Sequence, residues 1–369
     1  MKVTIFSNSK GGVFSYTINL VKGLAHKGCD VNVFFLTQSE ETKRLVASRH
    51  VHFNVLTTSN FVPNLRTIIN LFFHDRPDII HINFALFGPL AIFKKLVFKT
   101  PFIYTLHGLP QPWLHSSLVN KIKYTMESLL LPFVASQASA IVAVSNYVKD
   151  VLKIRYGLDS QVIYNGVNTS RFKPTNKKRS KRKLGYDETD FVVLFVGKLS
   201  PYKDPLTLIE AINKAIKINK NFHLIMVGTG DLYKEVIHAI DRLNLSSHVK
   251  PLGHVSGEEL RLCYNASNLF VLPTFNEAFG IVLLEAMASG LPIIASNAGA
   301  CPEVIGNAGI LFNPGDCLDL AGKIMQLSNN KKLLRRFSNE GLKRVQIFSW
   351  KATTTECWKI YREVIKQNE

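Results

Sequence analysis

The sequence has few cysteines, few acidic residues relative to basic ones, and no long apolar run. Its five cysteines are scattered over 369 residues, and no two of them have Cys-x-x-Cys spacing. We therefore expect the reduced thiols of a cytoplasmic protein, and neither a disulfide framework nor a structural zinc. No apolar stretch is long enough to cross a bilayer, and the opening residues read as a strand followed by two glycines, so we expect neither a membrane span nor a signal peptide.

Metal-binding patterns are missing as well. The chain contains no Asp-x-Asp motif, and its His, Asp and Glu residues do not cluster with the spacing of metal ligands. Hard cations such as Mg²⁺ need oxygen ligands that are brought together in such clusters. The sequence therefore predicts no catalytic metal and no cofactor apart from a bound substrate.

The shortage of acidic residues leaves a formal net charge of +18. This charge fits either a solvated surface with a flexible basic loop at 177–183 or attraction to an anionic partner. Nucleic acid is the weaker candidate, because no nucleic-acid-binding module is present. The basic, apolar segments 92–99 and 121–124, with the apolar run 129–133 nearby, fit an anionic membrane surface or, alternatively, core packing with lysines that reach solvent.

Short runs of β-branched and aromatic residues alternate with helix-length segments along the chain. The predicted strands are 3–6, 31–36, 79–82, 102–106, 140–144, 191–196, 223–227, 269–272 and 292–295. This alternation predicts an α/β protein with two doubly wound parallel-sheet (Rossmann-like) domains that face a cleft. We expect the first domain at 1–165, a linker at 166–185 and the second domain at 186–349.

Two glutamates point to a ligand. Glu285 lies in the run 279–288, which is apolar all round and long enough for a buried helix. A carboxylate there is costly unless hydrogen-bond donors satisfy it. Glu277 lies eight positions earlier, so one acid is predicted at the helix entrance and the other about two turns inside. Because hydroxyls donate to carboxylates and phosphate binds the N–H groups of a helix start, a sugar nucleotide would suit both.

Cationic side chains follow two other predicted strands. Lys198 and Lys203 come after the strand at 191–196 and could converge on the phosphate of a leaving nucleoside diphosphate, although they could also be exposed loop lysines. His107 ends the strand at 102–106, where it could orient a sugar hydroxyl or have a structural role.

Two glycine turns follow strands. Gly11 and Gly12 come after the first strand and would let a ligand approach the backbone, although a tight turn would need them too. The second turn, 227–231, lacks the third glycine of a dinucleotide-binding fingerprint because Tyr233 stands in its place. The sequence therefore favours turn geometry as its role.

Together these motifs resemble the retaining glycosyltransferases of family 4 (GT4), which have the GT-B fold. The strongest block is 276–292, where Glu277 and Glu285 form the family's E-x7-E signature, and the resemblance covers nearly the whole chain. It implies a hinge at 165–168 and a last helix, 350–369, that completes the first domain.

The resemblance also implies a role for each site residue. Glu277 would bind the hydroxyls of the donor sugar and Glu285 the ribose, while the base would stack at Val255. The implied donor-binding set is Gly11, Gly12, Val255, Glu277, Phe279, Gly280, Ile281, Val282 and Glu285, with the backbone of 279–282 on the phosphates. The implied catalytic set is His107, Lys198, Lys203 and Glu277.

Two positions depart from the family pattern. Lys198 replaces the usual Arg, which keeps the charge but loses the planar fork that grips phosphate at two points. In the block after the next strand, Ala300 follows Gly299 where the family has a second glycine. A close backbone approach to the sugar at Ala300 is therefore less expected.

These features predict a cytoplasmic enzyme that moves a sugar from a nucleoside-diphosphate sugar, taken as a UDP-sugar, to an acceptor hydroxyl with retention of configuration. The basic, apolar segments favour a glycan or lipid-linked acceptor of cell-envelope glycan or glycolipid synthesis, at the inner face of the membrane. Two alternatives stay open: a sugar-nucleotide epimerase on the same fold, and a non-catalytic sugar-nucleotide-binding subunit. A nicotinamide oxidoreductase is less favoured, because the glycine fingerprint is incomplete.

Overall fold

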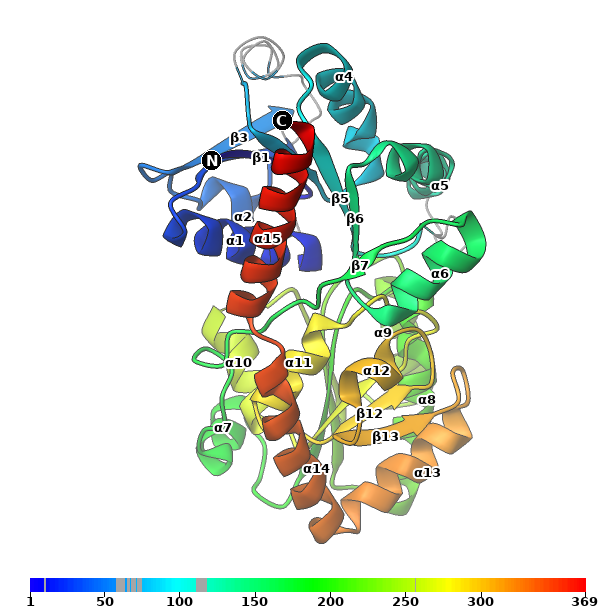
Figure 1. Ribbon diagram of the computed structural model, residues 1–369. Helices are drawn as coiled ribbons and strands as arrows, with labels where there is room; N and C mark the ends of the chain where they lie inside the picture. Colours follow the sequence, from blue (N-terminus) through cyan, green and yellow to red (C-terminus); the bar gives the residue numbers. More distant parts are fainter. Residues whose placement is uncertain are drawn as a thin grey trace. The chain divides into compact units, whose positions relative to one another are not determined.

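The computed structural model describes residues 1–9, 11–57, 64, 67, 71, 75–110, 118–255 and 257–369. The chain divides into two compact units, each with one parallel sheet (Figure 1). The first unit comprises Met1–Gln111, Ile122–Gly166 and Trp350–Glu369, and the second comprises Pro112–Lys121 and Val167–Ser349.

The first sheet has the strand order β3-β2-β1-β4-β5-β6-β7, with every described pair parallel. Its strands are β1 (Lys2–Ser7), β2 (Asp30–Thr37), β3 (Val51–Thr57), β4 (Ile79–Ile82), β5 (Phe102–Leu106), β6 (Ala140–Ala143) and β7 (Gln161–Val162). The order reverses between β1 and β4. In open parallel sheets, ligands bind beyond the carboxyl ends of the strands at such a reversal.

The second sheet has the order β10-β9-β8-β11-β12-β13, again parallel throughout its described pairs. Its strands are β8 (Phe191–Val196), β9 (Phe222–Val227), β10 (Val249–Gly253), β11 (Leu269–Leu272), β12 (Ile293–Ser296) and β13 (Gly309–Phe312). Here the order reverses between β8 and β11, so the loops that follow these two strands meet at the expected ligand position.

The helices alternate with the strands. In the first unit they are α1 (Gly11–His26), α2 (Glu40–Lys43), α4 (Gly88–Phe98), α6 (Asn146–Tyr156) and α15 (Trp350–Asn368), together with α5 (Leu118–Gln137), whose first residues fall in the second unit. In the second unit they are α7 (Lys177–Leu184), α8 (Pro205–Ile218), α9 (Tyr233–Arg242), α10 (Gly257–Ala266), α11 (Ile281–Ala288), α12 (Cys301–Ile305), α13 (Cys317–Ser328) and α14 (Lys331–Arg344).

The predicted α/β class with two Rossmann-like sheets is confirmed. Strands such as β8 are apolar almost without interruption because a parallel sheet buries both of its faces. The strands β3, β7, β10 and β13 were not among those predicted. β7 and β13 are short and β10 contains Pro251 and Gly253, so these three give no clear strand pattern. β3, in contrast, alternates apolar and polar residues from Val51 to Val55, and this strand signal was missed.

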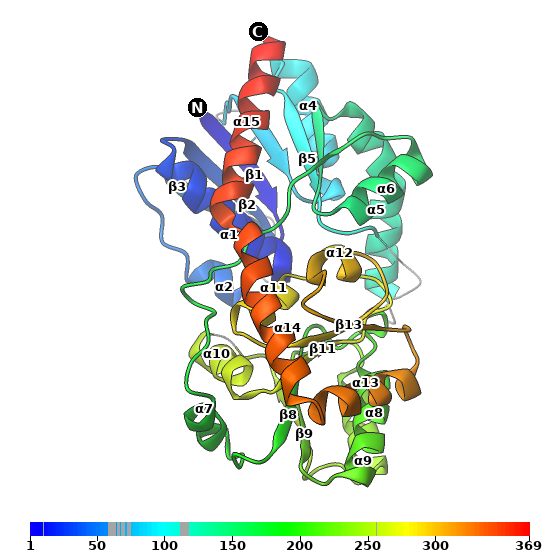
Figure 2. The same cartoon turned by 60° about the horizontal axis from the view of Figure 1, so that its bottom comes forward.

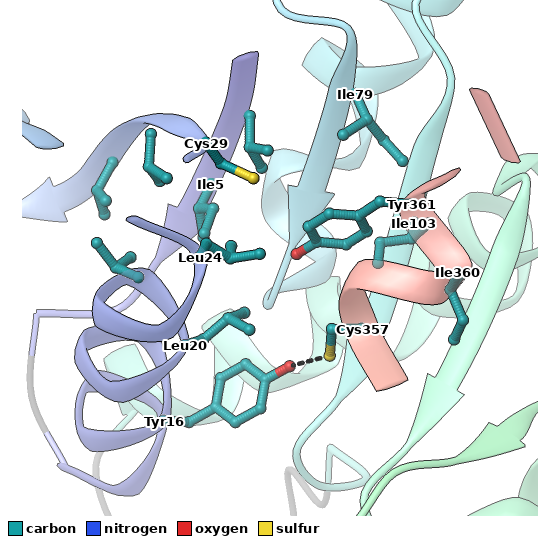
Figure 3. Close-up of a cluster of buried hydrophobic side chains, with 14 of the residues drawn as sticks. Ile5, Tyr16, Leu20, Leu24, Cys29, Ile79, Ile103, Cys357, Ile360 and Tyr361 are labelled. Carbon is teal, nitrogen blue, oxygen red and sulfur yellow. Dashed lines mark hydrogen bonds between the residues drawn. The ribbon is translucent and has the colours of Figure 1, made fainter. Parts of the chain in front are cut away.

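Helices α1 and α15, far apart in the sequence, lie side by side over the first sheet (Figure 2). The close-up in Figure 3 shows Tyr16 of α1 and Tyr361 of α15 within one buried apolar cluster. A Cβ atom on Gly23 would lie only 2.3 Å from Oγ1 of Thr354, so a glycine is needed where the two helices meet. The final helix therefore belongs to the core of the first unit.

The basic cluster at 177–183 is not a loop. It forms helix α7, which is capped by the Asn176 side chain at its start and ends at Gly185, with φ of 81°. The side chain of Lys181 is buried and donates to the main-chain oxygens of Glu188 and Asp190. The composition of this segment suggested a flexible linker, but these caps and contacts stabilise a helix there.

Candidate active site

The loop that carries Glu277 begins at the end of β11 and leads into helix α11. Gly280 precedes the helix with a φ of 84°, which a residue with a side chain rarely adopts. This turn starts α11 at Ile281, later than the apolar run alone indicates, so Glu285 lies just over one turn inside the helix and not two.

The start of α11 leaves main-chain groups open to a ligand. No described side chain caps this helix, and the first N–H groups of any helix lack partners within it. Ile281 and Val282 are half-buried, whereas Phe279 is buried and packs its ring edge-on against Phe348 at 5.8 Å. Phe279 could therefore meet a ligand only through its backbone, and its N–H already donates to Oε1 of Glu277 at 3.5 Å. The resemblance implies a backbone contact with phosphate for 279–282.

Glu285 has a hydrogen-bond donor from a neighbouring helix. The hydroxyl of Tyr264, on α10, donates to Oε2 of Glu285 at 2.8 Å. Desolvation raises the pKa of Glu285 to about 7, while this hydrogen bond and the charge of Arg171 act in the opposite direction. Within the described part of the chain, Oε1 of Glu285 has no hydrogen-bond partner. One carboxylate oxygen is thus held by protein and the other is available to a ligand hydroxyl.

Glu277 forms an ion pair with Lys203. Nζ of Lys203 contacts Oε2 of Glu277, and the two side chains are only 12% and 13% exposed. Burial, the largest single influence, lowers the pKa of Lys203, but the charge and hydrogen bond of Glu277 together with the nearby Tyr202 and Cys301 outweigh it, so the pKa is raised. Such a shielded pair interacts strongly, so each side chain fixes the position of the other.

Hydrogen bonds to main-chain carbonyls hold the Glu277 loop against its neighbours. The hydroxyl of Thr274 donates to the carbonyl of Tyr202, at 2.8 Å, in the loop that carries Lys203. On the other side, the Ala300 N–H donates to the carbonyl of Glu277 at 2.7 Å. A Cβ on Gly299 would lie 2.3 Å from that same carbonyl oxygen, whereas Ala300 has an ordinary φ of −84°. The fold therefore requires a glycine at position 299, where a side chain would collide with Glu277, but not at position 300.

Lys198 has a different carboxylate partner. Its Nζ lies 3.5 Å from Oδ2 of Asp231, and its side chain is 39% exposed. Asp231 comes from the glycine turn after β9, where a Cβ on Gly228 would lie 1.8 Å from the carbonyl oxygen of Gly197. The turn glycine thus lets the two loops approach each other, which confirms turn geometry as its role. The two lysines, predicted to converge on phosphate, are each paired with a separate acid here.

Val255 follows β10 and is buried. The end of β10 is joined to the glycine turn, because the Gly228 N–H donates to the carbonyl of Gly253 at 2.7 Å. The position predicted to contact the base therefore lies two residues beyond a main-chain contact with the turn that carries Asp231.

The remaining predicted residues belong to the first unit. Gly11 and Gly12 are exposed at the start of α1, and Gly11 has a φ of 73°. His107 follows β5, and its Nε2 lies 3.0 Å from Oδ1 of Asn83, which follows β4. The ring of Tyr16 meets the imidazole edge-on at 4.4 Å. Burial lowers the pKa of His107 to about 3, so the ring is neutral.

Three residues of these clusters were missed in the sequence: Tyr264, Asp231 and Asn83. Asn83 and Asp231 each follow a strand, and this position was a usable signal. Tyr264 lies within α10 and gives no such signal. No cluster of three or more potential metal ligands occurs among the described residues, and none of the described helices is long and apolar enough to cross a membrane.

Comparison with known proteins identifies the fold and the family. The sequence matches two family models, "Glycosyltransferase Family 4" over residues 10–171 and "Glycosyl transferases group 1" over residues 176–344. An uncharacterised glycosyltransferase of Methanocaldococcus jannaschii is 29% identical over 359 residues, which cover 96% of this chain and 95% of that protein.

Two solved structures are similar over their full length. Sucrose-phosphate synthase from Thermosynechococcus elongatus superposes with a TM-score of 0.86 at 21% identity, and both chains are covered completely. Anabaena HepE in complex with UDP-glucose superposes with a TM-score of 0.82 at 22% identity and covers 98% of this chain and 100% of its own.

Proposed function

This chain belongs to glycosyltransferase family 4 and has the GT-B fold, and from this premise we propose that it transfers a sugar from a UDP-sugar to an acceptor hydroxyl. The Lys203–Glu277 ion pair, largely shielded from solvent beside the open start of α11, is the observation that carries the proposal. A carboxylate suits sugar hydroxyls, and a cation next to helix N–H groups suits phosphate. The UDP moiety is favoured because HepE was solved with UDP-glucose.

The donor is proposed to bind along the carboxyl edge of the second sheet. Glu277 accepts hydrogen bonds from the sugar hydroxyls, and Oε1 of Glu285 accepts from the ribose. Lys198 and Lys203 stabilise the charge that develops on the diphosphate as its bond to the sugar breaks. Because these lysines supply positive charge at the leaving group, the reaction needs no divalent metal, and chelation with EDTA should leave turnover unchanged.

We further propose that the sugar is transferred with retention of configuration. In this proposal the acceptor hydroxyl attacks from the face that the diphosphate leaves, and the departing diphosphate takes the acceptor's proton. Glu277 supports this assignment because its carboxylate is engaged by Lys203 and so is better suited to holding the sugar than to attacking it. Proton NMR of the product's anomeric centre distinguishes retention from inversion.

The acceptor is proposed to be a glycan or a lipid-linked precursor of cell-envelope glycan or glycolipid synthesis. The support is the basic, apolar character of helices in the first unit, together with the overall excess of positive charge. We therefore propose that the enzyme acts on the cytoplasmic side, peripherally at the inner face of the membrane.

A panel assay tests the proposal. Purified protein is screened by thermal shift against nucleotides and sugar nucleotides, because a ligand that binds only the native state raises the unfolding temperature. The best donor is then incubated with candidate acceptors, and sugar transfer is measured. We expect stabilisation by UDP and by one UDP-sugar, followed by acceptor-dependent release of UDP.

The same assay separates the alternatives. Conversion of the donor to another sugar nucleotide without any acceptor would identify an epimerase instead. Tight donor binding with no product from any acceptor would identify a binding subunit.

A further inference from the structure

Exposed apolar side chains are concentrated on two helices of the first unit. Among the described residues, fourteen large apolar side chains are strongly exposed, and seven of these lie on α4 or on the part of α5 within the first unit. Single exposed apolar residues are normal on a soluble protein, but a cluster of them marks a surface that is covered by something.

Helix α5 is apolar on two opposite faces. Ile122, Met126, Leu129 and Phe133 are between 49% and 70% exposed. Their spacing of four, three and four residues places them within about 60° of one another around the helix. The opposite face, which includes Leu131 and Ala135, packs into the protein. The fold therefore uses one apolar face of α5 and leaves the other uncovered.

Helix α4 extends this surface. It exposes Phe93, Leu96 and Val97, by 41%, 76% and 54%. The two helices are neighbours, because Nζ of Lys95 donates to the carbonyl of Gln137 at the end of α5, at 2.7 Å (Figure 1). A Cβ on Gly88, the first residue of α4, would also lie 2.1 Å from Cγ2 of Val134.

The exposed charged side chains of α4 and α5 are all basic. Glu127 is the sole acidic residue of α4 and α5, and it is buried. Lysines 95, 99 and 123 are at least partly exposed beside the apolar residues, whereas Lys94 turns inward and donates to the main-chain oxygen of Asp75. Lys94 therefore contributes no charge to the exposed face of α4.

We propose that α4 and α5 form a docking surface for an anionic lipid bilayer. Their apolar side chains enter the boundary between head groups and acyl chains, and their lysines contact anionic head groups. The absence of exposed acidic side chains from both helices favours this occupant over a protein partner, for which mixed charges would be expected. The inference deepens the membrane-proximal acceptor of the proposed function, but binding can be measured without donor or acceptor.

Vesicle co-sedimentation of the full chain tests the proposal. Binding is compared on vesicles of phosphatidylcholine alone and on a roughly 7:3 mixture with phosphatidylglycerol, at low and high salt. The test variant is Leu129→Glu with Phe133→Glu. The matched control is Leu318→Glu on α13, because Leu318 is 67% exposed and Leu129 is 70% exposed.

We expect binding to the anionic vesicles that weakens with salt, falls by about tenfold or more in the double variant and is unchanged in the control. Equal binding of wild type and double variant, or equal binding to neutral and anionic vesicles, would overturn the proposal. A dimer in sedimentation velocity that the double variant abolishes, without any vesicle binding, would assign the surface to a second copy of the chain. Because UDP-induced thermal stabilisation is measured on the same samples, failure here is distinguishable from failure of the proposed function.

Discussion

The hydroxyl of Tyr264 donates a hydrogen bond to Oε2 of Glu285, and so satisfies half of a carboxylate that lies among apolar side chains. This contact explains how the helix tolerates the acid before any ligand binds. Only one of the two oxygens is satisfied in this way within the described residues. The other is the group that we assign to the ribose of the donor.

The raised pKa of Glu285 predicts pH-dependent donor binding. With a pKa of about 7 in the free protein, the carboxylate is mostly protonated at pH 6 and mostly ionised at pH 8. If the ionised form binds ribose, affinity for UDP-glucose should fall by about tenfold between pH 8 and pH 6. Isothermal titration measures this, and the diphosphate of UDP-glucose does not titrate in the range. The Glu285→Gln variant should bind more weakly and without this pH dependence; an unchanged pH profile in the variant would remove Glu285 from the site.

The pairing of Lys198 with Asp231 predicts opposite effects of two substitutions. A bound diphosphate must compete with Asp231 for Lys198, so Asp231→Asn should tighten UDP binding by about two- to fivefold, the range for a partly exposed ion pair. Lys198→Gln should weaken it, and Lys198→Arg, which keeps the charge, should have a small effect. Titrations with UDP check all three. A tenfold loss in Lys198→Arg would mean that the site is built around the lysine head group.

Asn83 is predicted to act through His107. Because the Asn83 side-chain oxygen accepts from Nε2–H, it leaves Nδ1 of the neutral ring as an acceptor for a hydroxyl. Asn83→Ala should lower kcat by about tenfold or more, as expected for a misoriented polar group, with little change in donor affinity. Nitrogen NMR of His107 should show a mixed tautomer in this variant. Asn83→Asp, which keeps the acceptor, should retain the Nε2–H form; an unaltered tautomer in Asn83→Ala would contradict the role.

Burial of Glu127 predicts a pH-dependent cost to stability. Desolvation raises the pKa of Glu127 to about 7, above the value of 4.5 for an exposed glutamate. The folded state therefore holds this proton more tightly, so stability decreases as the pH rises from 4.5 to 7. Glu127→Gln should stabilise the protein by roughly 3 kcal/mol at pH 8 and have little effect at pH 4.5. Urea unfolding at the two pH values measures this difference, and equal effects at both would contradict the assignment.

Much of the fold could be predicted from the sequence because parallel strands are continuous apolar runs. β8 and β11 are clear for this reason. Helix α7 could not be predicted, because its stability depends on the burial of Lys181 against carbonyls of a later turn. Composition alone describes that segment as polar and basic.

The positions of several candidate residues could be predicted from the sequence, but their contacts could not. Glu277, Lys203 and Lys198 each follow a strand at the reversal of the second sheet, a position that sequence order reveals. Their pairing with each other or with Asp231 depends on how closely neighbouring loops approach. Gly228 permits one such approach, but a glycine in the sequence does not show which loops will meet. The role of Tyr264 could not be predicted from the sequence, because its contact with Glu285 depends on where α10 lies relative to α11.

The most direct test of the account is the transfer rate of Glu277→Gln with the donor found in the panel. This change removes the charge that pairs with Lys203 and that holds the donor sugar, while keeping the shape of the side chain. The control is Glu340→Gln on α14, an acid that pairs with Lys343 at the surface. The account predicts that kcat falls by about a hundredfold or more in Glu277→Gln and stays unchanged in the control. Near-normal kcat in a correctly folded Glu277→Gln protein would contradict it.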